Sequence, residues 1–154
     1  MSGADTTFLD ANVLVYARDR NEPVKGPRAQ ALLSTLFLAG QPLVSVQVLS
    51  EFFWAATRKI KLPLSHQEAV AEARRLMILT RVVPMTPSLF ERALDLVASR
   101  QLPLWDAQVI AAALSSGATT LLSEDFQHRQ SIDGLVILNP FAPVFDESEV
   151  LGVS

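Results

Sequence analysis

The sequence predicts a single domain of the α/β class, built on a mostly parallel sheet. Short apolar segments that suit strands alternate with longer segments in which apolar residues recur at helical spacing, and this alternation is typical of parallel sheets. The length of 154 residues fits one domain with a substantial core. With 49% apolar and 19% charged residues, the composition is that of a globular protein and excludes a disordered or fibrous chain.

Five short apolar segments are predicted to be the strands of this sheet. They are residues 7–10, 43–46, 81–84, 119–123 and 135–138. In parallel sheets, ligands bind at the carboxyl ends of the strands. Asp10 stands at the end of the first segment, and Ser123, Glu124 and Asp125 stand at the end of the fourth. These two places are therefore candidates for a single site.

The segments between the strands carry signals for the beginning and end of helices. Ser65 and Glu68 have the spacing of a capping box, and the helix after them is predicted to turn Val70, Ala73 and Met77 inward. Further signals are Pro27, Thr86 and Pro87 at helix starts and Gly40 and Gly117 at helix ends.

Composition also narrows the chemistry and the compartment. The chain has no cysteine, which excludes disulfides, thiolate zinc sites and cysteine nucleophiles. No apolar run reaches the roughly 18 residues that a membrane span needs, and the N-terminal segment lacks the basic start of a signal peptide. We therefore expect a cytoplasmic protein with no membrane partner.

The net charge of −3 argues only weakly against a nucleic-acid partner. If several acids share one cation site, the rest of the chain is close to neutral. Basic residues also cluster in two places, and these clusters are Arg58, Lys59 and Lys61, and Arg74, Arg75 and Arg81. The overall charge therefore leaves nucleic-acid binding open.

An aspartate, Asp10, stands inside the apolar run FLDANVLVYA, with Asn12 two positions later. An isolated buried carboxylate is costly, so it must be paired, protonated, placed at a helix start or bound to a cation. Asn12 can cap the helix that follows, and it can also hydrogen-bond to an acid or to a metal-bound water. The two roles are compatible.

Two more acids share the apolar side of their predicted helices. Asp106 precedes Val109 by three residues, and Glu51 follows Val48 by three, so both are placed toward the core. Each has a structural alternative. Asp106 can cap its helix or interact with the helix dipole, and Glu51 can pair with an arginine.

The fourth acid comes from the pair that follows the predicted strand 119–123. Asp125 is the expected inward acid and Glu124 the less favoured one, although spacing does not decide between them. Four carboxylates close together cannot all stay ionised, and a divalent cation removes the conflict. Oxygen ligands without cysteine favour Mg²⁺ or Mn²⁺. Such a site suits hydrolysis of a phosphodiester by a metal-bound water.

Four segments in this order resemble the PIN-domain ribonucleases, especially the toxins of VapBC-type toxin–antitoxin pairs. The segments are FLDANVLVYA, SVQVLSEF, LPLWDAQVIAAAL and LLSEDFQHRQSIDGLVILNPF, and together they cover most of the chain. Each is weak alone, and the signal lies in their order and spacing. The resemblance implies a three-layer α/β/α sandwich over residues 1–141, and residues 142–154 are expected to form a polar acidic tail.

The resemblance also implies an endoribonuclease that cleaves RNA with Mg²⁺ or Mn²⁺, forms a homodimer and is neutralised by a cognate antitoxin bound over the site. The acids that match the catalytic, metal-binding set are Asp10, Glu51, Asp106 and Asp125, with Asn12 and Ser123 as matching polar residues. Ala11 replaces a usual hydroxyl residue, and Arg129 stands where glycine is common. No acid is missing.

Several further residues near the acids have two possible roles. His128 and Glu124 can contact the substrate or support the acids, although a solvated loop position is favoured for His128. Trp54 and Trp105 flank acids and can stack on a base, although packing in the core is favoured for both.

Two other functions compete with the nuclease. The chain can be a non-catalytic PIN-like module that binds RNA or protein. A phosphatase that uses Asp10 as nucleophile is the weaker alternative, because Asn12 stands where such enzymes commonly carry a second acid.

Overall fold

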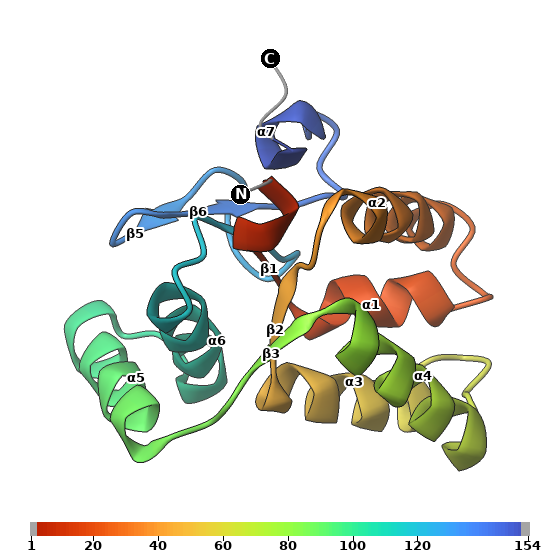
Figure 1. The fold of residues 1–154 in the computed structure, drawn as a ribbon, viewed down its shortest axis with the longest axis horizontal. Coiled ribbons are helices and arrows are strands. Elements are labelled where there is room, and N and C mark those ends of the chain that lie inside the picture. Colours follow the sequence, from red (N-terminus) through yellow and green to blue (C-terminus); the bar gives the residue numbers. More distant parts are fainter. Residues whose placement is uncertain (1–2, 152–154) are drawn as a thin grey trace.

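A six-stranded sheet separates two groups of helices in the computed structural model, which describes residues 3–151 (Figure 1). Helices α5 (Pro87–Arg100) and α6 (Leu104–Ser115) pack together on one side. Helices α1 (Ala11–Arg18), α2 (Lys25–Ala39), α3 (Val46–Arg58) and α4 (His66–Leu79) lie on the other. The predicted α/β/α sandwich is therefore confirmed.

The strand order is β3-β2-β1-β4-β6-β5, and every neighbouring pair is parallel except β5 with β6. The strands are β1 (Thr7–Leu9), β2 (Leu43–Ser45), β3 (Arg81–Val83), β4 (Thr120–Leu122), β5 (Ser131–Ile132) and β6 (Leu135–Leu138). All five predicted strands are present. Because β1 and β4 are neighbours in register, with Leu9 opposite Leu122, the residues after these two strands meet at one edge of the sheet.

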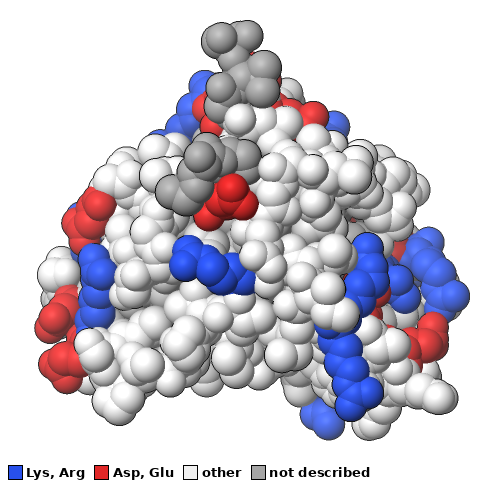
Figure 2. Space-filling view, in the orientation of Figure 1, with Lys and Arg blue, Asp and Glu red and all other residues white. Residues whose placement is uncertain are grey.

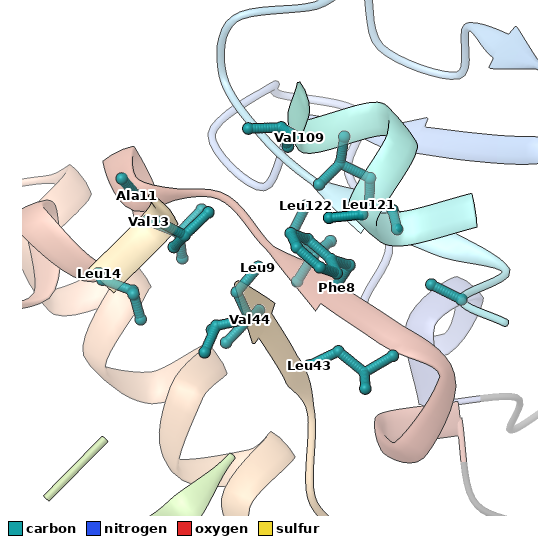
Figure 3. Close-up of a cluster of buried hydrophobic side chains, with 14 of the residues drawn as sticks. Phe8, Leu9, Ala11, Val13, Leu14, Leu43, Val44, Val109, Leu121 and Leu122 are labelled. Atoms are coloured by element: carbon teal, nitrogen blue, oxygen red, sulfur yellow. The ribbon is translucent and has the colours of Figure 1, made fainter. Parts of the chain in front are cut away.

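The central strands carry the core. β1, β2 and β4 are buried along their whole length, as expected for strands covered by helices on both faces. Figure 3 shows Phe8 and Leu9 of β1 among apolar side chains of the neighbouring strands and helices. This packing fixes the backbone just before Asp10.

Strand β5 was missed by the sequence analysis. It forms a two-residue hairpin with β6, in which Ile132 pairs with Leu135 across Asp133 and Gly134. Both turn residues have positive φ, 50° and 89°. An Asp-Gly dipeptide is the usual sequence of such a turn, so the signal was present in the sequence.

The helix starts agree with the predicted capping residues in two of three cases. Ser65 and Glu68 form the capping box of α4, and Thr86 caps α5 with Pro87 in its first turn. The third case was wrong, because α2 begins at Lys25, which makes Pro27 its third residue.

The predicted inner face of α4 was also wrong. The buried residues of α4 are Ala69, Glu72 and Leu76, whereas Val70 and Met77 are exposed. Glu72 is accommodated because it forms ion pairs with Arg18 at 3.1 Å and Arg75 at 2.7 Å. Because Glu72 is buried and paired, the inner face of α4 lies one residue away from the face that its apolar residues predict.

The two ends of the described chain lie together. The short helix α7 (Ser148–Leu151) contacts the 3₁₀ helix η1 (Gly3–Thr6), and Val150 of α7 is buried in the core. Residues 1–2 of the predicted domain and 152–154 of the predicted tail lie outside the described residues. None of the helices in the described part of the chain has the length and apolar character to cross a membrane.

Candidate active site

Asp10 follows β1 directly and is the N-cap of α1. Its carboxylate accepts hydrogen bonds from the Ala11 backbone N–H at 2.8 Å and from the Ser123 hydroxyl at 2.7 Å. The side chain is buried, with 4% of its surface exposed. The pKa of Asp10 is raised from 3.8 to about 6, mainly by burial. The charges of Asp125 and Glu51 act in the same direction, and the two hydrogen bonds act against it.

Asn12 does not cap α1, since Asp10 has that role. The Asn12 amide instead contacts the loop after β4: it donates to the Ser123 hydroxyl at 3.4 Å and accepts from the Glu124 backbone N–H at 3.3 Å. The buried Ser123 hydroxyl also accepts from the Asp125 backbone N–H at 3.1 Å. The Ser123 hydroxyl and the Asn12 amide therefore connect the residues that follow β1 with those that follow β4.

Glu51 is half-buried on α3. Burial raises its pKa, and the charges of Asp106 and Asp125 add to the effect, whereas a hydrogen bond from Gln47 at 2.9 Å lowers it. Gln47 also donates to the backbone carbonyl of Trp105 at 3.3 Å, so it joins α3 to the start of α6. The alternative of an ion pair with arginine is wrong, because none of the ion pairs between residues 3 and 151 includes Glu51.

Asp106 lies in the first turn of α6, which begins after Pro103. It is half-buried and does not cap the helix through its side chain, since the N-cap residue is Pro103. Burial raises its pKa, followed by the charge of Asp125. Asp106 therefore combines a place in the first turn with proximity to the other acids.

The adjacent residues Glu124 and Asp125 have different surroundings. Glu124 accepts a hydrogen bond from the Tyr16 hydroxyl at 2.6 Å and forms an ion pair with Lys25. Asp125 is exposed, and its charge raises the pKa of Asp10, Glu51 and Asp106. The arrangement therefore favours Asp125 as the fourth acid, with Glu124 engaged in holding the loop. Lys25 and Tyr16 were not identified as partners of Glu124, and nothing in their spacing reveals that role.

A pocket of about 410 Å³ opens beside these acids. Its walls include Glu51 and Asp125, with Trp54 and Lys59 of the α3 end facing the same space. The volume lies in the range of small-molecule binding sites. Glu51 and Asp125 therefore border a space that can admit part of a substrate.

The acids provide the donor set that a hard divalent cation prefers, with oxygen ligands only. Burial, followed by mutual repulsion, raises the pKa of Asp10, Glu51 and Asp106, and a bound cation would offset both effects. As their side chains are placed, no three acidic or histidine groups among residues 3–151 converge on a common metal position. The chemistry of the site fits Mg²⁺ or Mn²⁺, and binding requires these side chains to move together.

His128 is directed toward the C-terminal segment. Its Nδ1 accepts a hydrogen bond from the Asn139 backbone N–H at 3.0 Å, and its ring lies edge-on to Phe145 at 6.5 Å. Its Nε2 is buried without a hydrogen-bond partner in the described part of the chain. The favoured loop position in solvent is therefore wrong, and His128 anchors the loop after β4.

Neither tryptophan packs in the core. Trp54 is 48% exposed and Trp105 is 62% exposed, so the predicted burial of both was wrong. Both lie on helices that contribute an acid to the site, α3 and α6. Of the two, Trp54 lines the pocket beside the acids.

The family model of the PIN domain matches residues 7–131. No curated protein matches the chain significantly in sequence.

The chain is also similar to solved structures. One is Mycobacterium tuberculosis VapC20, a toxin that cleaves the sarcin-ricin loop (TM-score 0.62, 22% identity, 75% of this chain and 86% of that chain covered). Another is a toxin–antitoxin complex from Klebsiella pneumoniae (TM-score 0.64, 18% identity, 88% and 98% covered). A third is VapBC2 from Rickettsia felis, bound to a DNA fragment from its promoter (TM-score 0.61, 15% identity, 85% and 96% covered). At these identities the likeness shows a shared fold.

Proposed function

This chain belongs to the PIN-domain family, and from that premise we propose that it is a metal-dependent endoribonuclease, the toxin of a toxin–antitoxin pair. The observation that carries the proposal is the electrostatic coupling of four acids from separate elements. Asp125 raises the pKa of the three other acids, which come from β1–α1, α3 and α6. Acids from separate elements that lie within electrostatic reach of one another, at the edge of the sheet where ligands bind, are typical of a functional site.

Asp10, Glu51, Asp106 and Asp125 would hold one or two Mg²⁺ or Mn²⁺ ions. When bound, such an ion activates water and stabilises charge on the phosphate during hydrolysis of a phosphodiester. The protein's own contribution is orientation. The Ala11 N–H and the Ser123 hydroxyl fix the carboxylate of Asp10. Asn12 holds the backbone next to Asp125, and Gln47 positions Glu51 against the start of α6.

The proposed partners follow from the same assignment. The structural neighbours include toxin–antitoxin complexes, which supports a cognate antitoxin as protein partner. RNA is the substrate, the cytoplasm is the compartment, and a homodimer is the expected assembly.

The direct test is cleavage of RNA by the purified chain in Mg²⁺ or Mn²⁺. We expect cleavage that is abolished by EDTA and by Asp10→Asn. The matched control is Asp95→Asn, which makes the same chemical change at an exposed position of α5. Equal activity of the Asp10 variant and the control would contradict the assignment of Asp10.

One observation favours a second function. Because no three acids within residues 3–151 converge on a metal position, a non-catalytic module that binds RNA or protein is the competing candidate. Thermal stability in Mn²⁺ separates the two: a nuclease gains stability on binding the ion and the Asp10→Asn variant does not. A chain that neither gains stability nor cleaves RNA is the non-catalytic module.

A further inference from the structure

We propose that Trp54 and Lys59 form a subsite that binds an unpaired nucleobase and the phosphate next to it, beside the acidic centre. The inference rests on the proposed function and narrows its substrate to RNA with accessible single-stranded bases. It assigns a role to the part of the pocket that the acids do not occupy.

The position of Trp54 supports this role. Trp54 lies three residues after Glu51 on α3, so the two side chains are neighbours along the helix. Both line the pocket of about 410 Å³, together with Asp125. Trp54 is 48% exposed and lines the pocket, so part of its indole ring is accessible from this space. A base held there lies next to the acids that are proposed to act on the backbone.

Lys59 gives the same wall a positive charge. Its ammonium nitrogen lies 5.4 Å from the centroid of the Trp54 ring, and it lines the same pocket. On the face shown in Figure 2, Lys and Arg side chains stand in separate places with Asp and Glu side chains among them, so this face carries no continuous basic surface. A phosphate that approaches a cluster of carboxylates needs a neighbouring cation, and Lys59 provides one at the pocket itself.

The combination of groups identifies the ligand class. Every nucleobase has a flat face that stacks on an aromatic ring, and such stacking strengthens binding by roughly fivefold to more than a hundredfold per base. A base inside a duplex already stacks on its neighbours, so the wall accepts bases that are unpaired. An arginine-bearing peptide would suit the carboxylates of the pocket, but the ammonium of Lys59 repels it at the Trp54 wall.

The chain provides a clean experiment, because Trp54 and Trp105 are its only tryptophans. Trp105 is also exposed but does not line the pocket, so it is the matched control. Trp105→Phe leaves Trp54 as the only indole emitter, and Trp54→Phe leaves Trp105. Each variant is titrated with an octauridylate and with a blunt RNA duplex in Ca²⁺ buffer, and fluorescence is recorded.

We expect the octauridylate to quench Trp54 in the Trp105→Phe chain and to leave Trp105 unchanged in the Trp54→Phe chain. The duplex should quench neither. Trp54→Leu should weaken octauridylate binding at least fivefold and raise the KM for cleavage with little change in kcat, whereas Trp54→Tyr retains stacking and affinity. Lys59→Gln should reduce the slope of log affinity against log salt concentration by the amount that corresponds to roughly one phosphate contact.

Two outcomes would overturn the inference, and a third would separate it from the proposed function. Equal RNA affinity and equal KM in Trp54→Leu and Trp105→Leu would contradict the subsite. If both variants still cleave RNA, the assignment as a nuclease stands. Quenching of Trp54 by an arginine-rich peptide but not by the octauridylate would assign the wall to a protein partner. Quenching by RNA without any cleavage in Mg²⁺ or Mn²⁺ would support the subsite and contradict the proposed function.

Discussion

The hydroxyl of Ser123 donates a hydrogen bond of 2.7 Å to the carboxylate of Asp10, although 113 residues separate them in the chain. The contact is possible because β1 and β4 are parallel neighbours and both residues follow directly after their strands. Both side chains are buried. The contact joins the first acid to the loop that carries Asp125, so the geometry of the site depends on the pairing of these two strands.

The raised pKa of Asp10 predicts that the metal-free protein loses stability as the pH rises. The pKa is about 6 in the folded chain and 3.8 is the ordinary value, so the folded state holds the proton more tightly than the unfolded state. The free energy of unfolding therefore falls as the pH rises from about 4 to about 6 and is constant above about pH 6. The total change from Asp10 is of order 3 kcal/mol. Urea denaturation in EDTA across this range measures the effect.

Asp10→Asn removes this titration and should be more stable than the wild type above pH 6 in EDTA. Asp95→Asn on the exposed side of α5 should follow the wild-type profile. If Asp10→Asn keeps the full loss of stability between pH 4 and pH 6, the titration belongs to other groups.

Removal of the Ser123 hydroxyl should destabilise the fold and reduce activity together. Ser123→Ala leaves the Asp10 carboxylate without its side-chain donor, and it leaves Asn12 and the Asp125 N–H without their acceptor. Loss of such buried hydrogen bonds costs about 1–3 kcal/mol. Ser123→Thr keeps the hydroxyl and should retain stability and cleavage. Chemical denaturation and cleavage rates of the two variants provide the comparison, and equal rates would contradict a positioning role.

Glu124 and Asp125 should respond very differently to loss of charge. Glu124 is engaged by Lys25 and Tyr16, whereas the charge of Asp125 reaches the three other acids. Asp125→Asn should therefore lower cleavage by more than the roughly 10–100-fold that loss of a supporting contact to a metal ligand costs. Glu124→Gln keeps an acceptor for Tyr16 and should stay within that range. A larger loss in Glu124→Gln than in Asp125→Asn would reverse the two assignments.

The sequence predicted the parts of the fold that local rules determine. The parallel strands, the capping box at Ser65 and the cap at Thr86 follow from apolar runs and capping residues, which act over a few positions. The inner face of α4 could not be predicted, because burial of Glu72 depends on Arg18, which lies on another helix. Tertiary contacts of this kind leave no periodic signal.

The same distinction holds for the site. Asp10, Glu51 and Asp106 were selected because each lies within an apolar pattern, and Asp125 because it follows a predicted strand. In the structure the charge of Asp125 raises the pKa of the three others. Lys25 was missed because its contact with Glu124 spans 99 residues. The exposure of Trp54 was missed because an aromatic residue at helical spacing usually belongs to the core. Its place on the wall of the pocket beside α3 is visible only in the structure.

Gly3 should prove essential for docking of the C-terminal helix. A Cβ at this position would lie 2.1 Å from the Val150 carbonyl oxygen and 2.8 Å from the Leu151 carbonyl carbon. Both are backbone atoms, so Gly3→Ala must move α7 away from η1 and expose Val150. Loss of that burial costs about 1.5–3 kcal/mol and should lower Tm by at least about 3 °C.

Thermal denaturation and limited proteolysis of the C-terminal segment measure this effect. Val150→Ala should act in the same direction because it removes the same packing. Val144→Ala is the matched control, since Val144 lies in the same segment with 64% of its surface exposed. A Gly3→Ala chain with wild-type Tm and a protected C-terminal segment would show that α7 is not held against η1. Since η1 leads directly into β1, a loose α7 would also relax the strand that positions Asp10, and cleavage should decline along with Tm.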